Sequence, residues 1–189
     1  IRRRIALESV PEASVPRWVL RPVNLGRARS SGLELEAKGR ADQWLPGVFV
    51  ARSPVTLRAG LSIHRSRVEQ IDDPDARLEG QPPWQATLGL DRLPHGAWPG
   101  VGANLTYTPG FSTRQTDLQR VRRSAAQRLD VYALWRYGRD LRLRLAVQQA
   151  LPREQQTTQS ITADDGLAAS STLWRPLQRQ FNAHLVWRF

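Results

Sequence analysis

Apolar and polar residues alternate along most of this chain, which is the pattern of β-strands whose two faces meet different surroundings. The clearest stretch is Leu141–Gln148, where every odd position is apolar and every even position except Ala146 is polar. A helix over the same residues would mix the leucines with Arg142 and Arg144 and leave no apolar face. The pattern therefore predicts a strand at this place.

Seven stretches of the chain alternate in this way, and no stretch of comparable length shows helical periodicity. An eighth strand, partly cut off, is predicted over residues 1–7. The chain is thus predicted to be all-β, with about eight antiparallel strands in a single domain over residues 1–189. The alternating stretches are residues 33–37, 55–63, 84–90, 101–107, 129–137, 141–148 and 181–189.

The connections between these strands alternate in length. Outer-membrane barrels run up and down with short periplasmic turns and long outer loops. If the tight turn at residues 138–140 is periplasmic, all the long connections lie outside and the C-terminus is periplasmic. Residues 41–54 are an exception, because they are rather long for a periplasmic turn. The connections predicted to be long, polar and irregular are residues 69–83, 111–120 and 152–177.

Aromatic residues are predicted at both ends of the strands. Trp135 and Tyr137 end strands on the proposed periplasmic side, and Trp84, Tyr107 and Phe111 lie at strand ends on the proposed outer side. Amphipathic rings gather at both interfaces of a bilayer, because one edge of the ring is apolar and the other can be wet. This placement favours a transmembrane barrel with an apolar lipid-facing side and a polar interior.

Composition narrows the classes of partner. The chain carries 28 Lys+Arg against 17 Asp+Glu, a formal net charge of +11, and it has no Cys. The arginines are spread from Arg2 to Arg188 between apolar neighbours, whereas nucleic-acid binders gather their charge on one helix or patch. No nucleic-acid partner is therefore expected. No apolar run approaches the ~20 residues of a membrane-spanning helix.

Catalytic chemistry has little support in the sequence. His64, His95 and His184 lie in different strands or turns, and none neighbours a Ser or carboxylate in a known nucleophile arrangement. The acidic segment 72–75 lacks the Gly and the distal Glu of a calcium loop, so a solvated acidic loop is expected. We predict no enzyme, no catalytic residue, no metal site and no cofactor.

Charged residues on the polar face are expected to line the interior of the barrel. Glu34 and Glu36 are predicted beside Arg58 and Arg40, as ion pairs that order the strands or hold a plug. An arginine-rich interior also favours anionic cargo, through charge and bidentate hydrogen bonds.

The C-terminal stretch has a pattern of its own. Residues 181–189 end on an aromatic side chain and carry an apolar residue at every second position before it. This resembles the C-terminal signature by which outer-membrane barrels engage the barrel-assembly machinery. Its residues here are Phe181, Ala183, Leu185, Trp187 and Phe189.

Residues 23–37 resemble a segment of TonB-dependent outer-membrane receptors, Asn-x-Gly-x-Ala/Val-Arg-x-x-Gly-x-Glu-x-Glu, on a strand that descends to the periplasm. Residues 78–84 look like the approach to the next strand of those receptors. Residues 141–151 are similar to their penultimate strand, although Gln-Gln-Ala-Leu replaces the usual Asn-Asn-Leu-Phe/Leu. The positions that match the first motif are Asn24, Gly26, Ala28, Arg29, Gly32, Glu34 and Glu36.

The resemblance implies a fold and a function. Receptors of this family have about 22 barrel strands around an N-terminal plug domain. This chain has strands for about the last eight, so it is expected to be a C-terminal barrel segment without a plug. The resemblance implies uptake of a ferric siderophore or similar large nutrient across the Gram-negative outer membrane. The implied partners are TonB (through the absent N-terminal part), the barrel-assembly machinery, lipopolysaccharide and lipid.

Two other interpretations stay open at the level of sequence. Eight strands suffice to close a small barrel, so the chain could be a self-contained outer-membrane barrel with a structural or adhesive role. It could also be a soluble β-barrel that binds small apolar ligands and turns its apolar face inward.

The chain starts at Ile1 without an initiator Met or a signal region, which is expected of a processed chain or a cut piece.

Overall fold

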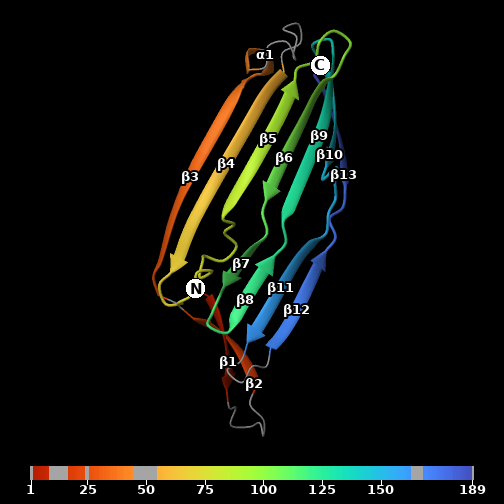
Figure 1. Cartoon of the computed structure of the whole chain (residues 1–189). Helices are drawn as coiled ribbons and strands as arrows, with labels where there is room; N and C mark the ends of the chain where they lie inside the picture. Colours follow the sequence, from red (N-terminus) through yellow and green to blue (C-terminus); the bar gives the residue numbers. More distant parts are fainter. Residues whose placement is uncertain (1, 9–16, 24–25, 45–54, 163–167, 189) are drawn as a thin grey trace.

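The computed structural model describes residues 2–8, 17–23, 26–44, 55–162 and 168–188. Within these ranges the chain forms antiparallel strands and one helix of four residues, α1 (Ala41–Trp44). The strands lie in three sheets of two, seven and four strands (Figure 1). The prediction of an all-β antiparallel fold is confirmed. No helix in the described ranges has the length and apolar character needed to cross a membrane.

The seven-stranded sheet, which we call the wall, is built from the seven stretches in which apolar and polar residues alternate. Its strands follow the order β13-β10-β9-β6-β5-β4-β3, and neighbouring strands are antiparallel. Within the described residues the wall is not closed, since β3 and β13 each pair with a wall strand on one side only. The strands are β3 (Ala28–Arg40), β4 (Val55–Val68), β5 (Trp84–Arg92), β6 (Gly100–Thr108), β9 (Ala126–Tyr137), β10 (Leu141–Gln148) and β13 (Gln180–Trp187).

A second sheet of four strands corrects the prediction of irregular loops over residues 111–120 and 152–177. Its order is β12-β11-β8-β7. Most residues of its longest strands are polar on both faces, as in the run Gln-Gln-Thr-Thr-Gln-Ser at residues 155–160, so no alternation marks them. The strands are β7 (Phe111–Arg114), β8 (Gln119–Arg123), β11 (Gln155–Thr162) and β12 (Ala168–Arg175).

The predicted eighth strand lies apart from the wall. Residues Arg2–Glu8 form β1, which pairs in an antiparallel hairpin with β2 (Arg17–Val23). These two strands make up the third sheet, so the described wall has seven strands instead of about eight.

Short and long connections gather at opposite ends of the wall (Figure 1). One end, here called the turn end, holds α1, the β5–β6 turn, the β9–β10 turn and the C-terminus. Gly138 has φ +64° in the β9–β10 turn, a left-handed conformation that glycine adopts without steric cost. The other end, the loop end, holds the segment between β4 and β5 and the whole second sheet. The predicted alternation of short and long connections is confirmed.

An ion pair ties α1 to the wall. The Arg40 guanidinium donates hydrogen bonds of 3.0 and 2.7 Å to the two carboxylate oxygens of Asp42. These bonds favour the ionised acid and hold the pKa of Asp42 below its usual value. The predicted exception at residues 41–54 thus begins with a helix, and residues 45–54 lie outside the described residues.

Little of the apolar surface is buried. Among the described residues the buried apolar side chains are Ala41, Val68, Ile71, Ala76 and Val121, and none belongs to the middle of the wall. Large side chains of the wall lie open instead.

Leu33 is 54% exposed, Leu88 58% and Leu185 63%. A closed soluble barrel would pack such residues into its interior, whereas in the described wall they are open.

Candidate functional site

The strand register gathers the apolar residues of the wall on one face. Ala59 on β4 is paired on one side with Ala37 and on the other with Leu88. The same row continues through Leu105 to Leu129 on β9. Neighbouring rows are apolar as well, and one of them consists of Leu35, Leu61, Ala86 and Tyr107. The wall therefore presents a continuous apolar face.

Aromatic side chains border this apolar face. At the loop end, the rings of Trp84 and Tyr107 lie with their centroids 5.5 Å apart. At the turn end, Tyr137 and Trp187 both pair with Leu141, and both are exposed. Trp135 lies one row further in, opposite Leu143. Their role as interfacial aromatics stays a prediction, which this two-ended arrangement supports.

Two aromatic residues of the turn end carried no sequence signal of alternation. Trp98 lies in the β5–β6 turn and is 71% exposed, and Trp44 ends α1 and is also exposed. Both stand outside strands, where period-two alternation cannot reveal them. Both therefore add exposed aromatic side chains to the turn end.

Phe111 differs from the other predicted interfacial aromatics. It lies in β7 of the second sheet, half-buried, with the Arg123 guanidinium 6.0 Å from the centre of its ring. Its position at the bilayer interface stays a prediction, but its surroundings are not those of Trp84 and Tyr107.

The opposite face of the wall is polar and carries a network of four side chains. Tyr132 on β9 donates a hydrogen bond of 2.5 Å to Oδ1 of Asp91 on β5. Arg58 on β4 forms an ion pair with the other oxygen of the same carboxylate. The Arg144 guanidinium of β10 lies 4.8 Å from the centre of the Tyr132 ring, in cation–π geometry. The network thus links four strands across the polar face.

Glycines make room for this network. Gly102 pairs with Tyr132, and a Cβ at position 102 would lie 2.2 Å from the tyrosine ring. A Cβ at Gly89 would lie 3.2 Å from Nε of Arg58. The tyrosine ring therefore lies over the backbone of β6, which is possible only where the facing residue has no side chain.

The predicted partners of two arginines are corrected. The sequence interpretation placed Glu34 and Glu36 beside Arg58 and Arg40. In the structure Arg58 pairs with Asp91 on β5, and Arg40 pairs with Asp42 in α1. The two glutamates do lie on the same face as Arg58, in the rows of Ser62 and Gly60.

The matched motif of residues 24–36 lies at the start of β3. Asn24 is outside the described residues. Gly26 has φ +80°, and Arg29 forms an ion pair of 3.0 Å with Glu69 beyond the end of β4. Gly32 pairs with His64, and Ala28 with Val68. Ala28 and Arg29 therefore join β3 to β4 at the loop end, whereas Glu34 and Glu36 lie in the middle of β3. The functional role of the motif stays a prediction.

The predicted assembly signature lies on β13, at an edge of the wall. Phe181, Ala183, Leu185 and Trp187 face the apolar side, in register with Val147, Leu145, Leu143 and Leu141. Phe189 is outside the described residues. Recognition by the assembly machinery stays a prediction.

The acidic segment 72–75 is held by arginines at the loop end. Arg120 on β8 forms ion pairs of 3.0 Å with Asp73 and 2.7 Å with Asp75. The backbone N–H of Arg114 donates a 2.8 Å bond to the carbonyl of Asp75. Asp72 is exposed and lies 4.0 Å from Arg67. The segment is thus clamped against β7 and β8 instead of being freely solvated, and the described residues contain no metal-ligand cluster of three or more such groups.

The arrangement defines a class of protein: a wall of antiparallel strands with one exposed apolar face and one polar face is the wall of a transmembrane β-barrel. Residues 1–148 match the family described as TonB dependent receptor-like, beta-barrel. The chain belongs to this family of TonB-dependent receptor barrels. No curated protein and no solved structure matches it.

Family membership settles the coarse function. TonB-dependent receptors are non-enzymatic transporters of the Gram-negative outer membrane, which confirms the prediction that the chain is not an enzyme. The match covers the wall from β3 to β10, and the strands β11, β12 and β13 lie beyond residue 148.

Filling the space opposite Tyr132 should weaken the wall. Gly102→Ala places a methyl group inside the tyrosine ring, so we expect the free energy of unfolding to fall by ~1–3 kcal/mol. Urea unfolding of the protein in lipid vesicles, followed by tryptophan fluorescence, measures this change. Gly89→Ala is the matched control, since its methyl group would lie 3.2 Å or more from its nearest neighbours, the side chains of Arg58 and Asn104. Equal effects of the two substitutions would contradict the packing described.

Proposed function

We propose that this chain forms part of the wall of an outer-membrane transporter that imports a ferric siderophore or a similarly large, scarce nutrient with energy supplied through TonB. The observation that carries the proposal is the exposed apolar face of the wall, opposite a polar face, in a member of the receptor-barrel family. An apolar face of this size is stable only against hydrocarbon. The polar face then borders an aqueous interior.

The unpaired edges of the wall support the proposal that it is part of a larger barrel. Backbone groups of a strand edge have no water to bond with inside a bilayer, and each unpaired group costs several kcal/mol. In the described residues the outer edges of β3 and β13 lack a partner strand, and β1 pairs with β2 instead of closing the wall. We therefore assign the chain to a segment of a barrel of about 22 strands, in which further strands of the receptor pair with β3 and β13.

The sides of the membrane follow from the connections. Short turns lie in the periplasm and long loops outside in barrels of this type. This supports a periplasmic turn end, with α1 and the C-terminus, and an outer loop end that carries the second sheet. A nutrient arriving from outside would meet the second sheet first.

In this arrangement the wall and a plug domain have different roles in transport. The wall supplies the lipid-facing surface and the polar inner surface, which includes Arg58 and Arg144. Coupling to TonB belongs to a plug domain that fills the barrel, for which the polar face is the matching surface. The proposed partners of the remaining surfaces are the assembly machinery at β13 and lipopolysaccharide at the arginines of the loop end.

Arginine substitutions on opposite faces of one strand test the orientation of the wall. Leu105→Arg places a charge in the middle row of the apolar face, so we expect it to reduce the stability of the membrane-folded protein by ~2–4 kcal/mol. Asn104→Arg, the adjacent position on the polar face, should change stability far less. Urea titration in lipid vesicles measures both, and the reverse ranking would contradict the assignment of faces.

Uptake measurements test the transport itself. In cells grown under iron limitation, the receptor should import a radiolabelled ferric siderophore only when TonB is present. Deleting the receptor gene and deleting TonB should each remove this uptake, because the family couples import to the inner membrane through TonB. Import of iron at the same rate without TonB, or no siderophore imported in a survey of hydroxamate, catecholate and carboxylate types, would contradict the proposal.

A further inference from the structure

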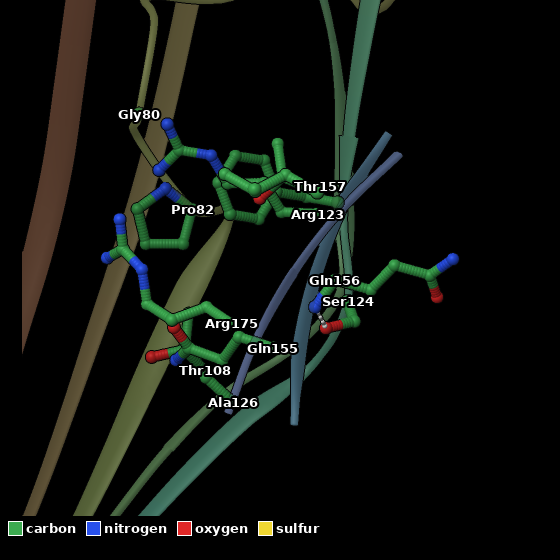
Figure 2. Close-up of a pocket in the computed structure, with 12 residues that line it drawn as sticks. Gly80, Pro82, Thr108, Arg123, Ser124, Ala126, Gln155, Gln156, Thr157 and Arg175 are labelled. Carbon is green, nitrogen blue, oxygen red and sulfur yellow. Dashed lines mark hydrogen bonds between the residues drawn. The ribbon is translucent and has the colours of Figure 1, made fainter. Parts of the chain in front are cut away.

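A pocket lies at the loop end, between the wall and the second sheet (Figure 2). It encloses about 320 Å³, enough for a small organic molecule or for one group of a larger ligand. The ends of β6 and β9 form one side, the strands β8, β11 and β12 another, and the segment before β5 a third. Its lining residues are Gly80, Pro82, Thr108, Phe111, Arg123, Ser124, Ala126, Gln155, Gln156, Thr157, Leu173 and Arg175.

Two arginines give the pocket a positive charge. Arg123 and Arg175 belong to the same face of the second sheet, since Arg123 shares a row with Thr157 and Leu173, and Arg175 lies two residues further along β12. Figure 2 shows their guanidinium groups reaching to the same side of the pocket, with Pro82 between them. The lining contains no Asp or Glu.

These arginines differ from their neighbour Arg120. Arg120 is neutralised by the carboxylates of Asp73 and Asp75. Within the described ranges, neither Arg123 nor Arg175 forms an ion pair with a carboxylate of the chain. Their donors are therefore available to an anion that enters the pocket.

The rest of the lining suits an organic body. Phe111, Leu173 and Pro82 supply apolar surface beside the guanidinium groups. The pocket lies on the polar side of the wall, because Thr108 and Ala126, which line it, form the last row of the polar face. This side faces away from the proposed hydrocarbon, so a lipid is excluded as the ligand. A solute on its way to the interior reaches this side.

From this geometry we infer that the pocket between β8, β11 and β12 is an outer recognition site for an organic carboxylate, with Arg123 and Arg175 binding the anionic oxygens and Phe111, Leu173 and Pro82 contacting the apolar body. The inference rests on the proposed function for its biological meaning, since it assigns the nutrient to the carboxylate-bearing class. Binding at the pocket, however, can be measured without transport.

Titration with a small aromatic carboxylate tests the site. The intact receptor in outer-membrane vesicles is titrated with 4-fluorobenzoate, and binding is followed by the ¹⁹F line width. We expect saturable binding by the native protein, and a rise of about tenfold in the dissociation constant for Arg123→Gln and for Arg175→Gln, because each removes charge-assisted hydrogen bonds. Arg122→Gln is the matched control, since Arg122 lies on the opposite face of β8, in the row of Ser112 and Thr158.

Two further probes separate charge from shape. The uncharged 4-fluorobenzamide should bind at least tenfold more weakly than the carboxylate, and inorganic phosphate should compete poorly because it lacks an apolar body. Absence of 4-fluorobenzoate binding by the native protein, unchanged binding in both Gln variants, or phosphate competing as well as benzoate would each overturn the inference. A receptor with TonB-dependent uptake but no such binding refutes the pocket alone, whereas carboxylate binding without TonB-dependent uptake refutes the transport proposal alone.

Discussion

Every strand of the wall must present apolar side chains to hydrocarbon on one face and polar side chains to water on the other. Its backbone groups meanwhile form hydrogen bonds only with neighbouring strands. In a bilayer the backbone has no other partner, so a long paired sheet is the form in which such strands are stable. The register of the wall meets both demands at once, because the row that carries Leu88 and Leu105 contains apolar residues from several strands. A shift of one residue in any strand would turn its polar residues toward the lipid.

On the polar face, a large side chain is accommodated over a glycine of the neighbouring strand. Tyr132 lies over Gly102 and joins Asp91, Arg58 and Arg144 into a network that links side chains of four strands. Neither arginine is left without a compensating group near it. At the loop end, arginines have two different roles. Arg120 forms ion pairs that hold the segment after β4 against the second sheet, whereas Arg123 and Arg175 line a pocket to which their N–H donors are available.

Sequence patterns predicted the parts of the fold that alternate. The seven wall strands have a period of two because their faces meet opposite environments, and that contrast is what a pattern can report. The second sheet has no such contrast, so the pattern predicts an irregular loop where the strand β11 lies. The partner of Arg58 was also missed, because Asp91 reaches it through strand pairing across 33 positions, and nothing local marks that pair. The pocket of Arg123 and Arg175 depends on the same unpredicted sheet.

The exposure of the two faces to lipid can be measured directly with spin labels, since the chain has no native Cys. Nitroxides attached to Leu88→Cys and to Asn104→Cys in the membrane-embedded receptor are compared for collision with oxygen, which concentrates in hydrocarbon, and with a water-soluble nickel chelate. We predict that the label at position 88 collides mainly with oxygen and the label at position 104 mainly with the chelate. The opposite result, or labels at both positions accessible to the chelate alone, would contradict a wall whose leucines face lipid.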